Sequence, residues 1–92
     1  MEHEQVLSEQ YEASLRDLAK RVGEKAEKDE SMDGAVAQQY INPFMTTLEK
    51  LRDYDQGKWQ PNPEYDHTPD VLYQSLQRYE NMLKRYLQTG RI

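Results

Sequence analysis

Apolar residues recur at helical spacing in three separate stretches of the chain, with polar residues between them. In the first stretch the steps are three and four residues, which is the pattern of one buried face on an amphipathic helix. The residues of this row are Leu7, Tyr11, Leu15, Leu18, Val22 and Ala26. The pattern predicts a helix over about residues 4–28, and the short connection after it makes the next helix an antiparallel neighbour.

The second stretch, residues 33–56, has the densest apolar content and is expected to be the central helix. Its apolar row consists of Val36, Tyr40, Phe44, Leu48 and Leu51. Pro43 lies in the middle, and proline lacks an N–H group and clashes with the carbonyl group four residues before it. Either the helix bends at Pro43, or Asn42 caps a second, shorter helix that begins there. We favour the bend because the apolar row keeps its spacing across the proline.

The third stretch has the clearest boundaries. Thr68, Pro69 and Asp70 supply a capping hydroxyl group, a proline suited to the first helical position and an acid near the positive end of the helix dipole. We predict a helix over residues 69–88, ended by Gly90. Its apolar row has heptad spacing, which would allow pairing with a second copy of the same helix. The row is Leu72, Leu76, Tyr79, Leu83 and Tyr86.

Residues 57–68 follow neither a helical nor a strand pattern, and the prolines there favour extended backbone. Two aromatic residues, Trp59 and Tyr65, lie in this loop. Either Trp59 folds back onto the end of the bundle, or both rings are exposed anchors for a partner. We therefore predict a single all-α domain over residues 1–92, an antiparallel three-helix bundle with a long, proline-containing loop before its third helix.

Composition limits the size of the core. Apolar residues make up 36% of the 92 residues, against about 45–50% in an ordinary globular domain. So thin a core is expected to gain stability from a homodimer or from a complex with a larger protein. The sequence contains no cysteine, no apolar run near the ~20 residues of a membrane span and no apolar signal region at its start. We expect no disulfide, no membrane partner and a cytoplasmic location.

The formal net charge of −5 argues against non-specific binding to nucleic acid, but the charge is unevenly distributed. Residues 71–92 carry four basic side chains and only Glu80 as an acid. Glutamine, asparagine and arginine on the polar side of the third helix are also the residue types that read base edges. A nucleic-acid-linked regulator is therefore an alternative function, and an acidic inhibitor that mimics DNA through the first helix is another. The second is weaker because lysine and arginine interrupt the acids of that helix.

No residue pattern indicates catalysis, a cofactor or a metal. His3 and Glu4 begin like a zincin motif, but Leu7 stands where the second histidine is required. Asp53 and Asp55 fall on different faces of a helix. The serines lie away from any glycine-rich turn, and the four glycines are too scattered to form a phosphate-binding loop. We predict that the chain is not an enzyme and holds no metal or cofactor.

The leading hypothesis is a non-enzymatic protein-binding module, such as an adaptor, a chaperone-like protein or an inhibitor that masks a surface of another protein. Partly exposed tyrosine and tryptophan side chains suit such an interface. The partner is expected to be another protein, a second copy of this chain, or both. The predicted partner-binding residues are Trp59, Tyr65, Tyr73, Gln77, Arg78, Asn81, Lys84 and Arg85.

Overall fold

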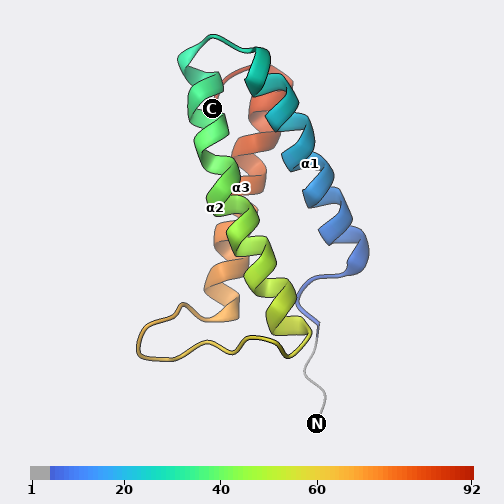
Figure 1. The fold of residues 1–92 in the computed structure, drawn as a ribbon, viewed down its shortest axis with the longest axis vertical. Coiled ribbons are helices and arrows are strands. Elements are labelled where there is room, and N and C mark those ends of the chain that lie inside the picture. Colours follow the sequence, from blue (N-terminus) through green and yellow to red (C-terminus); the bar gives the residue numbers. More distant parts are fainter. Residues whose placement is uncertain (1–4) are drawn as a thin grey trace.

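The computed structural model describes residues 5–92 and has three α-helices and no strand within that range (Figure 1). The helices are α1 (Glu9–Lys28), α2 (Met32–Asp55) and α3 (Pro69–Thr89). α2 runs antiparallel to the other two, so α1 and α3 run in the same direction (Figure 1). Each helix packs against both others in a bundle that measures 49 × 29 × 17 Å. The predicted all-α three-helix bundle is confirmed.

Local capping signals set most of the helix boundaries. Ser8, Ser31 and Thr68 precede the three helices, and each hydroxyl accepts a hydrogen bond of 3.0–3.3 Å from the amide three residues further on. Each bond satisfies one of the N–H groups that the first turn of a helix leaves without a partner. Gly90 ends α3 with φ at 75°, a left-handed conformation that favours glycine.

The start of α1 differs from the prediction. The predicted start at about residue 4 lies outside the described residues, and residues 5–8 are not helical. Instead, the amides of Val6 and Leu7 donate hydrogen bonds of 2.7 and 2.8 Å to the carboxylate of Asp55, at the end of α2. The segment crosses the end of the bundle, buries Leu7 to 2% exposure and becomes helical only after Ser8.

Pro43 does not break α2, which continues through it as one helix. The alternative of a second helix capped by Asn42 is therefore wrong. The hydroxyl of Thr47 donates a 2.8 Å hydrogen bond to the carbonyl oxygen of Pro43, four residues before it. Because neighbouring helices hold both ends of α2, the hydrogen bond lost at the proline costs less than it would in an isolated helix.

The buried face of α2 begins on different residues from those predicted. Val36 and Tyr40 are only half-buried, while Gly34 and Ala37 are buried. A Cβ atom on Gly34 would lie 2.8 Å from the side chain of Asp29, which is closer than such atoms approach. The turn between α1 and α2 therefore requires a residue without a side chain at position 34.

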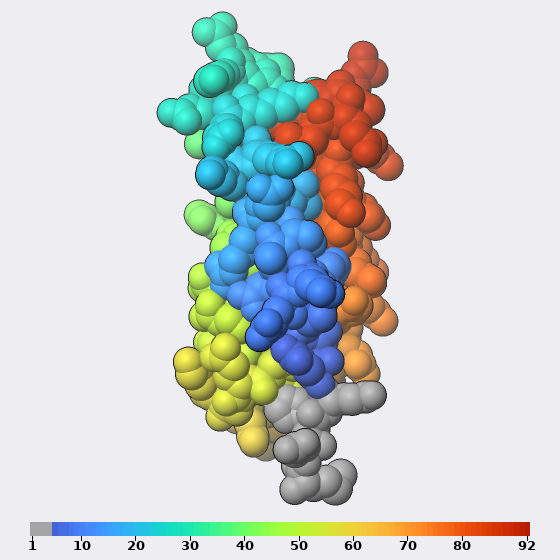
Figure 2. Space-filling model, turned by 90° about the vertical axis from the view of Figure 1, so that its right-hand side faces the viewer, coloured from blue at the N-terminus to red at the C-terminus, as the bar shows by residue number. Residues whose placement is uncertain are grey.

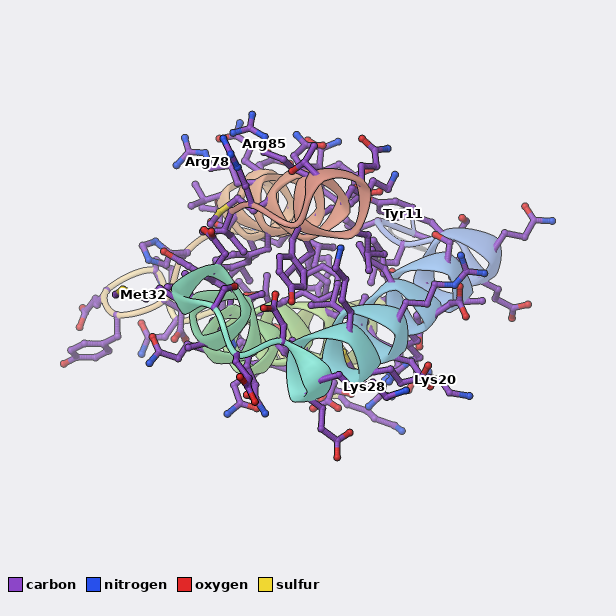
Figure 3. The ribbon with its side chains drawn as sticks, turned by 90° about the horizontal axis from the view of Figure 1, so that it is seen from above. Tyr11, Lys20, Lys28, Met32, Arg78 and Arg85 are labelled. Atoms are coloured by element: carbon purple, nitrogen blue, oxygen red, sulfur yellow. The ribbon has the colours of Figure 1, made fainter. Side chains whose placement is uncertain are left out.

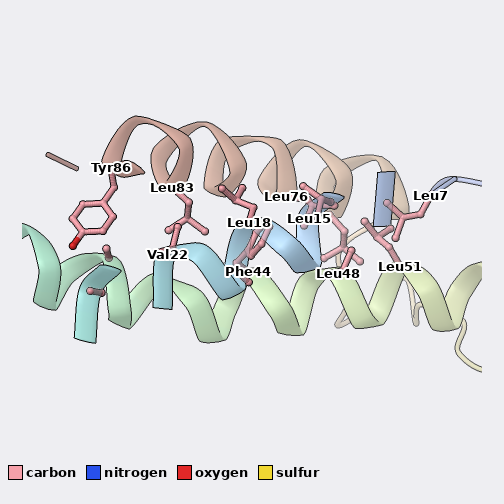
Figure 4. Packing of buried hydrophobic residues seen from close by; sticks show 14 residues of the cluster. Leu7, Leu15, Leu18, Val22, Phe44, Leu48, Leu51, Leu76, Leu83 and Tyr86 are labelled. Atoms are coloured by element: carbon pink, nitrogen blue, oxygen red, sulfur yellow. The ribbon is translucent and has the colours of Figure 1, made fainter. Parts of the chain in front are cut away.

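The buried apolar residues form one cluster that runs the length of the bundle (Figure 4). Phe44 has no exposed surface, and Tyr86 is equally buried. No helix among residues 5–92 is both long and apolar enough to cross a membrane. The cluster consists of Leu7, Leu15, Leu18, Ala19, Val22, Ala26, Ala37, Phe44, Leu48, Leu51, Leu72, Leu76, Leu83 and Tyr86.

Replacing Phe44 with alanine should lower the free energy of unfolding by about 3–5 kcal/mol, because a fully buried ring is lost and a cavity remains. Urea unfolding followed by circular dichroism measures the change. Tyr65→Ala is the control, since that ring is 82% exposed, and it should change the free energy by no more than ~0.5 kcal/mol. A loss below ~1 kcal/mol for Phe44→Ala would contradict a core built around this ring.

Candidate functional site

The polar residues of α3 that the sequence singled out share one exposed surface. Figure 3 shows Arg78 and Arg85 pointing outward from α3, away from the other two helices. We call this surface the outer face of α3. It consists of Gln74, Gln77, Arg78, Asn81, Lys84, Arg85 and Gln88, all exposed. Five of the predicted partner-binding residues are thus brought together by the 3.6-residue repeat of one helix.

The charges on the outer face of α3 are unequally balanced. The ammonium nitrogen of Lys84 lies 2.8 Å from the carboxylate of Glu80, which neutralises much of its charge. Among residues 5–92, neither Arg78 nor Arg85 has a carboxylate within 4 Å. The two guanidinium groups are seven residues apart, which is roughly 10 Å along a helix. The face therefore presents two uncompensated positive charges on an acidic chain.

Glu80 also fastens α3 to α1. Its carboxylate accepts a 2.6 Å hydrogen bond from the hydroxyl of Tyr11. Burial, followed by this hydrogen bond, raises the pKa of Tyr11 above its ordinary value. The ring of Tyr11 lies 6.1 Å from that of Tyr73, which is half-buried against the core. Tyr73, a predicted partner-binding residue, therefore lies on the side of α3 that faces α1 and not on the outer face.

A second connection holds the other end of α3. The hydroxyl of Tyr86 donates a 2.6 Å hydrogen bond to Asp29, and Lys25 lies 4.9 Å from the centre of the tyrosine ring. Lys25 also donates to the carbonyl oxygen of Tyr86 at 3.0 Å. Burial, and then the bond to Asp29, raises the pKa of Tyr86 to about 12, while the same bond lowers the pKa of Asp29 to about 2. α3 is therefore held against α1 at both ends, which fixes where its outer face points.

The two aromatic residues of the loop behave differently. Trp59 is half-buried and packs against the core, with the ammonium nitrogen of Lys50 5.7 Å from its ring. Its backbone amide donates to the carbonyl oxygen of Asp53 at 3.3 Å. These contacts favour the interpretation in which Trp59 folds back onto the bundle. Tyr65, in contrast, is 82% exposed.

Hydrogen bonds within the loop hold Tyr65 in place. The carbonyl oxygen of Asn62 accepts bonds from the amides of Tyr65 at 3.0 Å and Asp66 at 2.8 Å, and its side chain accepts one from Glu64 at 3.0 Å. The carboxylate of Asp66 accepts a 2.8 Å bond from the amide of Asn62. This turn was not predicted from the sequence, although the Asn62-Pro63 pair at its start is a turn signal. An ordered turn thus carries an exposed ring.

The exposed features described above are the outer face of α3 and the ring of Tyr65. Between residues 5 and 92, no group of three or more histidine, aspartate or glutamate side chains is placed to hold a metal ion. No protein-family model, no curated protein and no solved structure matches this chain. The outer face of α3 and Tyr65 are therefore the features from which a function is inferred.

The hydrogen bond from Tyr86 to Asp29 predicts that the folded protein becomes less stable at alkaline pH. The unfolded chain ionises Tyr86 near the ordinary pKa of 10, whereas the folded chain holds the proton until about 12. The contribution of neutral Tyr86 to the free energy of unfolding is therefore fully present below pH 10 and is lost as the pH rises towards 12. Urea unfolding across this range should show the loss.

The control for this prediction is Tyr86→Phe, which cannot ionise. Its stability should fall less steeply between pH 10 and 12, with the remaining fall coming from Tyr11. Equal slopes in the two proteins would show that Tyr86 is not held in its neutral form by the fold.

Proposed function

We propose that this chain is a non-enzymatic protein-binding module of the adaptor, chaperone-like or inhibitor kind, which masks an acidic surface of another protein. The outer face of α3 makes the principal contact, and Tyr65 makes a second one. The cytoplasmic location expected from the sequence remains part of this proposal.

The single observation that carries the proposal is the pair of uncompensated arginines. A protein surface normally gains little from isolated exposed charges, but arginine binds carboxylates through two parallel hydrogen bonds. Arg78 and Arg85 are flanked by exposed glutamine and asparagine, which can donate to carboxylates or backbone carbonyl groups. An acidic protein surface supplies both kinds of acceptor.

Tyr65 supports the proposal independently. A tyrosine ring adds apolar area and a hydrogen-bonding hydroxyl group, a combination enriched at interface hot spots. Because the Asn62 turn already holds the backbone around it, binding would cost less conformational entropy than binding through a disordered loop. Trp59 is a poorer candidate because its ring already contacts the core.

The competing function is a nucleic-acid-linked regulator that uses the same outer face. In its favour, the glutamine, asparagine and arginine side chains of this face are all exposed. Against it stands the net charge of −5, which opposes approach to phosphates. A DNA mimic has less support, because Glu12 and Asp17 of α1 form ion pairs of 2.9 Å with Arg16 and Arg21.

Reversing the charge of both arginines should abolish binding to the partner. We expect Arg78→Glu/Arg85→Glu to recover at least ~10-fold less partner than the native chain in quantitative pull-downs from the native source. Lys20→Glu/Lys28→Glu is the control with the same change in charge. Both lysines are exposed on α1, on the side of the bundle away from Arg78 and Arg85 (Figure 3). It should recover the partner normally. Equal recovery by all three proteins would remove the outer face from the proposed function.

A gel shift at low salt separates the two functions. We expect no shift of duplex or single-stranded DNA or RNA at micromolar protein, because the chain repels the phosphate backbone. A shift that Arg78→Glu/Arg85→Glu removes would instead establish the nucleic-acid function for the same face.

A further inference from the structure

The side of the molecule where α1 and α3 lie next to each other carries a second surface, visible in Figure 2. An open groove of about 440 Å³ runs between the two helices. Leu18 and Leu87 line it from the two helices, and Asp17 and Arg21 stand beside it on α1. We call this surface the α1–α3 face. Lys84 and Gln88, which also belong to the outer face of α3, line the groove from α3.

The apolar part of the α1–α3 face is incompletely covered. Leu87 is only half-buried, as are the rings of Tyr11 and Tyr73, which lie between the same two helices. Partly covered leucine and tyrosine side chains next to charged ones resemble the centre and rim of a protein interface. The face is therefore suited to a helical partner.

The charges of the face restrict what that partner is. Asp17 and Arg21 are four residues apart on α1 and 2.9 Å from each other, with more than half of each side chain exposed. The pair has no net charge, so it attracts neither a strongly acidic nor a strongly basic surface. It fits a surface with the same two charges in reverse order, which a second α1 running in the opposite direction provides.

We propose that two copies of this chain dimerise through their α1–α3 faces with their α1 helices antiparallel. A two-fold axis at the groove brings the half-buried Leu87 side chains of both copies together, while Leu18 is only 6% exposed and adds little to the contact. The same axis places Asp17 of each copy opposite Arg21 of the other. Because the contact is the same on both copies, it closes after two chains and does not continue into a fibre.

Other parts of α3 are unsuited to this contact. The heptad row that suggested pairing of α3 with a second copy already packs inside the bundle. Its buried members are Leu72, Leu76, Leu83 and Tyr86. The outer face of α3 would bring Arg78 and Arg85 of two copies towards each other and repel. The dimer shares Lys84 and Gln88 with the outer face of α3. It leaves Arg78 and Arg85, which do not line the groove, available for the proposed function in both copies.

Sedimentation equilibrium over a range of concentrations tests the proposal. The native chain should show a reversible monomer–dimer equilibrium. Asp17→Arg leaves two positive charges on the face and Arg21→Glu leaves two negative ones, so each variant alone should dimerise at least ~10-fold more weakly. An equimolar mixture of the two variants should form a 1:1 heterodimer with near-native affinity, because opposite charges then face each other across the axis.

The mixture also controls for folding, since a misfolded variant could not restore the complex. Lys20→Glu and Glu24→Lys are matched charge reversals at exposed positions of α1 outside the groove, and each should dimerise like the native chain. Arg78→Glu/Arg85→Glu should also dimerise normally, so failure of the proposed function and failure of this proposal are seen separately. A native chain that stays monomeric up to about 1 mM, assembly beyond two chains, or a mixture that stays monomeric would each overturn the proposal.

Discussion

The packing of three narrow apolar rows into one column constrains everything else in this molecule. The bundle is only 17 Å across in its shortest dimension, so nearly every large aliphatic side chain is used to hold the helices together. Few large apolar residues remain exposed among residues 5–92, and the contacts proposed here accordingly use mainly polar side chains and tyrosines. Two hydrogen-bonded tyrosines, Tyr11 and Tyr86, add polar connections between α3 and the α1 side of the bundle near the two ends of α3.

The elements that the sequence predicted well are those whose signals are local. The limits of α3 follow from Thr68, Pro69 and Gly90, and continuity of α2 through Pro43 follows from the unbroken spacing of its apolar row. The start of α1 could not be found in this way, because the bond from Leu7 to Asp55 joins residues 48 positions apart. The burial of Gly34 was missed for a related reason, because its close approach to Asp29 leaves no sign in the spacing of apolar residues.

The residues of the candidate site were likewise predicted well only where the signal is local. The periodicity of α3 was enough to place Gln77, Arg78, Asn81, Lys84 and Arg85 on one exposed face. It could not show that Glu80 would neutralise Lys84, or that Tyr73 would turn towards α1, because both depend on which helix lies alongside. Trp59 and Tyr65 were indistinguishable as loop aromatics, and only the contacts of Trp59 with the core and the internal bonds of the Asn62 turn separate them.

The bare backbone of Gly34 has a consequence for how this protein can change over time. Even a single Cβ atom at that position would collide with Asp29, whose carboxylate accepts the hydrogen bond from the hydroxyl group of Tyr86. A substitution in the first turn of α2 would therefore disturb the far end of α3, although the two segments are distant in the chain. Natural variants of this scaffold should accordingly tolerate replacements over much of their surface while retaining the glycine, and its loss would mark a chain that joins its helices differently.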